Sequence, residues 1–187
     1  DSVSPNAGSG AIQTFSFVFS DTQSSTNLLA IAVLITTGGS GTNACYIVYD
    51  RVAGSVSLRS DNALTSGTKA LNSTATLQNS QCVLGATTAS LSALSLTFTA
   101  TITFKPAFNG VKNIFMYASE SAGNTGWILR GNFTVLAGGT PVANSVVPGS
   151  GSGPGQRFSF TISDSSGSSY LTQLVVLIAA TLDNANA

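Results

Sequence analysis

Residues 14–37 read TFSFVFSDTQSSTNLLAIAVLITT, and a closely related stretch, RFSFTISDSSGSSYLTQLVVLIAA, occupies residues 157–180. The two stretches are offset by 143 residues (157 minus 14), and at this offset residues 2–44 align with residues 145–187 without a gap. Repetition at a fixed distance is typical of proteins built from arrayed structural modules. We therefore interpret the chain as one complete repeat followed by the opening part of a second repeat.

The repeat divides the chain into three parts. Residues 1–144 form the first repeat, which is long enough to bury a sizeable core. Residues 145–156, SVVPGSGSGPGQ, have the glycine- and serine-rich composition of a flexible linker. Residues 157–187 are expected to supply two strands of the second repeat, docked on the chain's own first repeat or on a neighbouring molecule. By the same alignment, residues 1–13 are expected to be a linker that runs into an edge strand.

The hydrophobic pattern predicts strands and no helix. Residues 94–104 alternate apolar residues with Ser and Thr, which indicates a strand with one core face and one threonine-rich face toward water. Residues 29–37 are apolar at nearly every position, as is typical of a central strand covered on both faces. Residues 62–80 are expected to be irregular apart from a short strand near residues 75–77. Further strands are expected at residues 15–20, 44–51, 55–60, 112–119 and 126–136.

Seven or so short strands with frequent turns indicate an all-β fold, an immunoglobulin-like antiparallel β-sandwich followed by the first strands of a second repeat. Within this sandwich we expect Trp127 to be a core or corner residue rather than a ligand platform. Carbohydrate binding by a face of the sandwich is an alternative function. It would require aromatic rings that are exposed on that face. Its candidate residues are Tyr46, Tyr49, Tyr117 and Trp127.

Four strings, NACYIVYDR, NSQCVL, LSLTFTATITFKPAFNGVKNIFMYAS and SAGNTGWILRGNFTV, resemble an immunoglobulin-like repeat of about 140 residues. That repeat occurs in multiples in large secreted or surface proteins of acidobacteria and related environmental bacteria. The resemblance covers most of residues 1–140. Its most specific marks are Cys45, the NSQC run ending at Cys82, the FKPAF run and the Gly126-Trp127 pair. It implies an extracellular stalk or adhesive module, and it brings no catalytic residues to this chain.

Charge is scarce in this sequence. Seven basic and seven acidic residues cancel, and only 7% of residues are charged, against about 25% in ordinary domains. No cluster of Lys or Arg is present, so nucleic acid is not expected as a partner. The lack of net charge permits close packing between molecules. No run of about 20 apolar residues occurs, so we expect no membrane insertion. We expect an extracellular or cell-surface location, and the sequence from Asp1 contains no signal peptide, as would follow if one had already been removed.

The sequence contains two cysteines, Cys45 and Cys82. They are compatible with one disulfide, which would place the chain in an oxidising compartment, or with two free buried thiols. A disulfide would close a loop of 37 residues (82 minus 45) and stabilise the fold by about 3 to 4 kcal/mol.

No set of catalytic residues can be named, and we expect neither an enzyme nor a cofactor. The absence of histidine excludes histidine-based acid–base chemistry and histidine metal ligands. Calcium is the best ionic hypothesis, since Asp21 recurs as Asp164, although an acidic residue at a strand end is commonly a turn former. The spacing of the carboxylates favours no glycosidase pair. These carboxylates are Asp1, Asp21, Asp50, Asp61, Glu120, Asp164 and Asp183.

Two kinds of covalent modification can be considered. Lys69, Lys105 and Lys112 could form a side-chain amide with Asn or Asp, and the alternative is that they are solvated lysines at strand ends. Asn72 and Asn132 begin the glycosylation triplets NST and NFT, which a chain rich in Ser and Thr also contains by chance.

The second repeat predicts assembly. A two-stranded hairpin is only marginally stable in water, so an apolar one has to pack on something. We predict that the chain binds other copies of itself head to tail, forming a filament by strand addition or complementation. The alternative is a part of a longer tandem array, with the tail folded on its own first repeat, acting as a spacer module in a secreted multidomain protein. The predicted strand-addition interface consists of Phe158, Phe160, Ile162, Leu171, Leu174, Val176 and Ile178.

Overall fold

The computed structural model describes residues 2–164 and 167–180, which belong to two compact units, Asp1–Gly139 and Thr140–Ala187. Strands make up both units, and the described residues contain no α-helix. Three short 3-10 turns occur, η1 (Ser25–Asn27), η2 (Pro106–Phe108) and η3 (Ser168–Tyr170). The expected all-β class is therefore confirmed, because apolar residues that recur at every second position favour strands.

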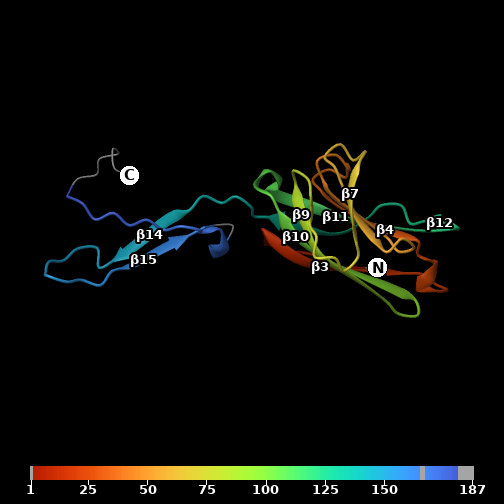
Figure 1. The fold of residues 1–187 in the computed structure, drawn as a ribbon, viewed down its shortest axis with the longest axis horizontal. Helices are drawn as coiled ribbons and strands as arrows, with labels where there is room; N and C mark the ends of the chain where they lie inside the picture. Colours follow the sequence, from red (N-terminus) through yellow and green to blue (C-terminus); the bar gives the residue numbers. More distant parts are fainter. Residues whose placement is uncertain (1, 165–166, 181–187) are drawn as a thin grey trace. The chain divides into compact units, whose positions relative to one another are not determined.

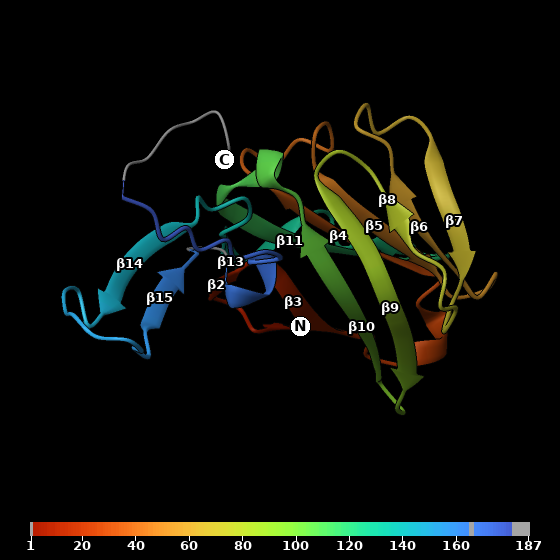
Figure 2. The same cartoon turned by 60° about the vertical axis from the view of Figure 1, so that its left-hand side comes forward.

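The first unit is a sandwich of two sheets (Figures 1 and 2). One sheet has the order β1 (Ser2–Ser4), β3 (Ile12–Ser20), β10 (Ser95–Phe104), β9 (Cys82–Leu91) and β8 (Leu77–Gln78). The other has the order β2 (Ser9–Gly10), β13 (Ile128–Val135), β11 (Gly110–Glu120), β4 (Ala30–Thr36), β5 (Cys45–Asp50), β6 (Ser55–Arg59) and β7 (Ser66–Ala70), with β12 (Gly123–Asn124) paired to β11. Two sheets packed face to face confirm the expected β-sandwich.

Strands β3 and β10 bring the core side chains of the first sheet together. Phe17 lies opposite Phe98 in their antiparallel ladder, and buried residues alternate along the whole of β10. The predicted alternation is confirmed, except that Leu94 precedes the strand and is exposed. The threonine-rich face of β10 is half-buried rather than open to water. The reason is that polar side chains of adjacent strands pack against each other on this face. The hydroxyl groups of Thr14 on β3 and Thr101 on β10, for example, form a hydrogen bond of 2.8 Å.

Aromatic rings join the two sheets. Tyr49 of β5 stacks on Phe98 of β10, with ring centroids 5.4 Å apart and planes inclined by 9°. Phe15 of β3 meets Phe133 of β13 edge to face at 5.3 Å. Offset stacked and edge-to-face pairs of this kind add about 0.5 to 1.5 kcal/mol each to the effect of burial. The core is therefore a continuous aromatic layer between the sheets.

A disulfide between Cys45 and Cys82 also ties the sheets together, since it connects the start of β5 to the start of β9. The prediction of one disulfide is confirmed, and the alternative of two free thiols is excluded. The bond closes 37 residues of chain and should stabilise the fold by about 3 to 4 kcal/mol, by restricting the unfolded state.

The predicted central strand is β4. It lies between β11 and β5, and every residue after Ala30 is buried. On one face of the sheet, Leu34 is the register partner of both Phe115 and Tyr46, so aromatic neighbours on each side cover it. Alternate residues such as Val33 face the core. Both faces of β4 are thus covered, which explains its uninterrupted apolar sequence.

Three predictions of local structure were incomplete. Residues 1–13 are not only a linker, because β1 joins one sheet and β2 joins the other, parallel to β13. Strand β9 was not predicted, since its sequence CVLGATTASL has too few large apolar residues to show a clear period of two. Strand β7 lies within the stretch expected to be irregular, and of its five residues only Lys69 is buried.

The second unit repeats the opening of the first. Strands β14 (Val142–Val147) and β15 (Ser159–Ser163) pair antiparallel, and η3 stands where the alignment places η1. Strand β14 includes residues 145–147, which were expected to belong to the linker. Residues 171–180, including the part that aligns with β4, contain no strand. The ladder contacts Ser145 with Thr161, Val146 with Phe160 and Val147 with Ser159 repeat those of Ser2 with Val18, Val3 with Phe17 and Ser4 with Ser16.

Candidate functional site

Two carboxylates meet at the end of β3 and β11, Asp21 and Glu120. They line a hollow of about 230 Å³, and protonated Glu120 can donate a hydrogen bond to the Asp21 carboxylate there. Asp21 Oδ1 also accepts hydrogen bonds from the backbone N–H groups of Gln23 and Ser24, each at 2.8 Å. An aspartate that accepts hydrogen bonds from the backbone two and three residues further on stabilises a turn. These contacts therefore favour the turn-forming role over calcium binding. The part of the chain that the structure describes holds no group of three or more metal-ligating side chains, and Asp1 and Asp183 lie outside it.

The hydrogen bonds shift the pKa values of the two carboxylates in opposite directions. The backbone N–H groups of Ser24 and Gln23 lower the pKa of Asp21 below its ordinary 3.8. Asp21 therefore adds stability above pH 3.8, and this stability is lost as the pH falls through the lowered pKa. The hydrogen bond with Asp21 raises the pKa of Glu120 above its ordinary 4.5. Glu120 therefore adds stability below pH 4.5 that is lost as the pH rises through the raised pKa.

The lysines are not all solvated, which corrects one expectation. Lys69 and Lys112 are buried, and this burial lowers the pKa of both ammonium groups. Lys69 Nζ donates to the backbone carbonyls of Ala75 and Gly85, and Lys112 Nζ donates to the carbonyl of Asn109. Because these partners are backbone carbonyls, the contacts do not favour a side-chain amide. For the third lysine, Lys105 Nζ donates to Gln78 Oε1 at 2.9 Å.

Both candidate glycosylation sites have exposed asparagines. Asn72 lies in a turn with φ 61°, and Asn132 lies on β13. Glycosylation at either position is therefore sterically open.

Three aromatic side chains from separate parts of the chain form one cluster on the outer face of the larger sheet. The ring of Trp127 lies 5.5 Å from that of Tyr46 and 5.3 Å from that of Tyr117. Trp127 is 41% exposed, so it is not a core residue, which was one of the two expected placements. The fourth aromatic candidate, Tyr49, is buried in the core and is not available to a ligand. Arg59, which sequence reasoning did not single out, lies over the ring of Tyr46 at 5.7 Å.

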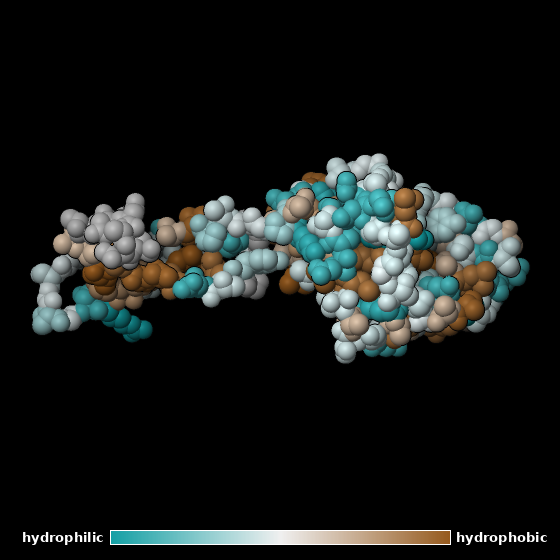
Figure 3. Space-filling view, turned by 45° about the horizontal axis from the view of Figure 1, so that its top comes forward, coloured by the Kyte–Doolittle hydropathy of each residue, from teal (hydrophilic) through white to brown (hydrophobic). Residues whose placement is uncertain are grey.

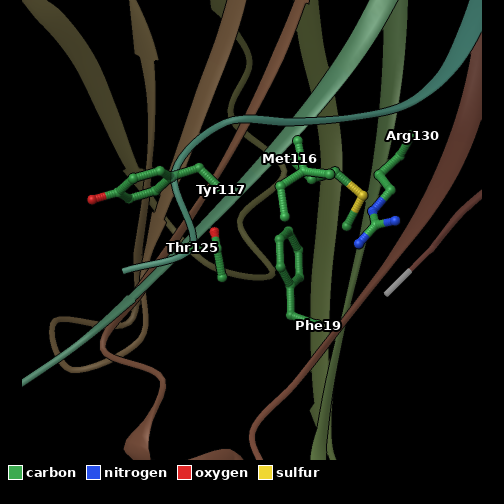
Figure 4. A pocket seen from close by; sticks show the side chains of 6 residues that line it. Phe19, Met116, Tyr117, Thr125 and Arg130 are labelled. Carbon is green, nitrogen blue, oxygen red and sulfur yellow. The ribbon is translucent and has the colours of Figure 1, made fainter. Parts of the chain in front are cut away.

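These residues border a hollow of about 360 Å³. A second hollow, on the other side of Tyr117, is lined by Phe19, Met116, Thr125 and Arg130 (Figure 4). It has room for about 10 Å³, roughly the space that one water molecule needs. Figure 4 shows the Tyr117 side chain directed away from Phe19 and Met116. Of the two hollows, only the one beside the aromatic cluster is large enough for an organic ligand.

The second unit exposes apolar side chains that the first unit buries. Phe158 and Phe160 are 40% and 39% exposed, whereas their equivalents Phe15 and Phe17 are fully buried. Figure 3 shows apolar side chains gathered on the surface of this unit. A hollow of about 300 Å³ is lined by Phe160, Ile162 and residues 171–174. Of the other residues predicted for the interface, Ile162 and Leu171 are half-buried, and Leu174, Val176 and Ile178 are exposed.

Comparison of the chain with known protein families, curated proteins and solved structures finds no match. In the described residues, no helix has the length and hydrophobicity needed to cross a bilayer. A functional proposal for this chain therefore depends on its own residues.

Proposed function

We propose that this chain is an extracellular structural or adhesive module of immunoglobulin-like repeats, which binds other copies of itself head to tail by strand complementation. One observation carries the proposal. Strands β14 and β15 have the register of β1 and β3, yet Phe158 and Phe160 are about 40% exposed where Phe15 and Phe17 are fully buried. In the described residues, the second unit thus has the strand pair of a sandwich and no further strand to cover it.

The sequence of residues 173–179 supports the same conclusion. At the positions of Ile31, Val33 and Ile35, which are buried in β4, the second repeat has Leu174, Val176 and Ile178. These three side chains are exposed in the second unit. Exposed apolar groups that lie close together commonly mark a contact surface. The apolar sequence of the core-facing side of β4 is therefore retained in a segment that, among the described residues, pairs with no neighbouring strand.

The first unit of a second copy contains places of the required shape, which its own Phe15 and Phe17 fill. In its first unit, the rings of Phe15 and Phe17 pack against Phe98, Phe104 and Phe133. If β14 and β15 replace β1 and β3 of that copy, Phe158 and Phe160 enter the same places. Backbone hydrogen bonds to β10 would supply affinity, and the two rings would supply specificity. Repetition of this contact is heterologous and does not close, so it produces a filament.

Other features support an extracellular structural role. The disulfide requires an oxidising environment to form, and the near absence of charge removes repulsion between copies.

The test is the concentration dependence of assembly in the full chain, followed by light scattering and electron microscopy. We expect filaments or oligomers that grow with concentration, and mostly monomer for the double variant Phe158→Ser, Phe160→Ser. Leu64→Ser is the matched control, because Leu64 is 79% exposed in the first unit, and it should assemble normally. Normal assembly of the double variant would contradict the proposal.

The alternative proposal is a spacer module of a secreted multidomain protein, in which the open face packs against another part of the same polypeptide. A chain that stays monomeric at every concentration favours this alternative over filament formation.

A further inference from the structure

The aromatic cluster lies on the face of the larger sheet that is turned away from the core. Tyr46 on β5 and Tyr117 on β11 are half-buried, whereas the residues next to them in sequence, such as Ile47 and Met116, are buried in the core. Strand β4 separates the two tyrosines, and Trp127 precedes β13. The three rings therefore form a continuous surface across neighbouring strands.

Small residues on β4 make this surface concave. Ala30 and Ala32 line the hollow between the aromatic side chains of the flanking strands, and Ala32 is the register partner of Tyr117. In the second repeat the same two positions hold Gln173 and Val175, although the core-facing positions between them stay apolar. The hollow is thus a feature of the first unit and not a requirement of the fold. Its volume of about 360 Å³ lies within the usual range of ligand sites.

The hollow also contains an unpaired positive charge. The guanidinium of Arg59 lies 5.7 Å from the centre of the Tyr46 ring, and among the described residues no hydrogen bond or ion pair of this side chain is found. Its Nε is buried without a hydrogen-bond partner. A guanidinium with free donors binds carboxylates through charge-assisted hydrogen bonds. The site therefore combines an aromatic surface with a cation that lacks its anion.

We propose that Tyr46, Arg59, Tyr117 and Trp127 bind an acidic pyranose, a uronic acid residue of a polysaccharide. The apolar C–H face of a pyranose ring packs on the exposed ring of Trp127. Its carboxylate pairs with Arg59, and its hydroxyl groups form hydrogen bonds with the hydroxyls of Tyr46 and Tyr117, which line the hollow. A neutral sugar would leave Arg59 without an anion, and an anion without an apolar face would leave the rings uncovered. This inference goes beyond the proposed function and does not depend on assembly.

Trp127 is the one tryptophan of the sequence, so its fluorescence reports directly on the site. The full chain is titrated with an oligogalacturonate and, in parallel, with the methyl ester of the same oligosaccharide, which lacks the charge. We expect a saturable change in Trp127 emission with the acid and about tenfold weaker binding of the ester. Titration calorimetry of Trp127→Ala, which has lost the fluorophore, should show no binding.

Arg59→Gln is expected to weaken binding of the acid by about tenfold or more, and to bind the ester as the unchanged chain does. Arg157→Gln is the matched control, since it removes the same charge from the other unit, and it should bind normally. Equal binding of acid and ester, unaffected by Arg59→Gln, overturns the assignment of an acidic ligand. An emission and a heat signal that stay unchanged with both sugars overturn the site itself. The assembly variant Phe158→Ser, Phe160→Ser should bind the acid normally, which separates this test from that of the proposed function.

Discussion

The two equivalent phenylalanines Phe17 and Phe160 allow a direct test of the difference between the units. Phe17 is fully buried, with ring centroids of Phe15 at 5.8 Å and Phe98 at 6.4 Å. Replacement of a buried phenylalanine by alanine costs about 3 to 5 kcal/mol, because apolar contacts are lost and a cavity remains. Phe160 is 39% exposed and belongs to the other unit. We expect Phe17→Ala to destabilise the first unit strongly and Phe160→Ala to leave it unchanged.

Urea unfolding followed by tryptophan fluorescence measures this difference, because Trp127 lies in the first unit and reports on that unit alone. With a denaturant slope of about 2 kcal/mol per molar, a loss of about 4 kcal/mol lowers the midpoint by about 2 M urea. Phe17→Leu is the conservative control and should lose much less than the alanine variant. The measurement is made at low protein concentration, so that assembly does not contribute.

Two results would refute the reasoning. If Phe160→Ala lowered the midpoint as much as Phe17→Ala, both rings would lie in the same core. If Phe17→Ala shifted the midpoint by less than about 0.5 M, Phe17 would not be closely packed.

The other predictions use the same unfolding assay. Removing the disulfide by substituting both cysteines with alanine should cost about 3 to 4 kcal/mol, and a loss near zero would contradict its role in linking the sheets. Gly131→Ala places a Cβ 2.3 Å from the carbonyl oxygen of Asn6, so a loss of about 1 to 3 kcal/mol is expected, and an unchanged stability would be inconsistent with this close approach. Asp21→Asn should lower stability near neutral pH, with the difference from the unchanged chain disappearing as the pH falls through the lowered pKa of Asp21. Glu120→Gln should remove the loss of stability that occurs as the pH rises through the raised pKa of Glu120, and urea midpoints between about pH 3 and pH 7 that match those of the unchanged chain would argue against this pair.

The sequence predicted those parts of the fold that depend on local pattern. The alternation along β10 and the apolar run of β4 indicated strands with one and two buried faces, since neighbouring side chains of a strand point to opposite sides. Strand β9 was missed because its small and polar residues carry no such pattern, and its pairing with β10 defines it instead.

Other features could not be predicted because they bring together residues that are distant in sequence. Asp21 and Glu120 are neighbours only because β3 and β11 end at the same place. The sequence around either residue does not indicate that the other lies nearby. The cluster of Tyr46, Tyr117 and Trp127 likewise depends on β5 and β11 lying on either side of β4. The pattern also placed Trp127 at the start of a strand, but it could not show which face of the sheet the ring covers.

By itself, the sequence determined that the chain is all-β, that it begins to repeat after 143 residues, and which side chains share a face in the strands with a clear alternation, such as β3 and β10. The tertiary structure alone decided which strands are neighbours, and therefore which exposed rings meet and which apolar faces remain uncovered. The physical reason is that a period of two is a property of the backbone of one strand, whereas a sheet is made by hydrogen bonds between strands that the chain brings together from far apart.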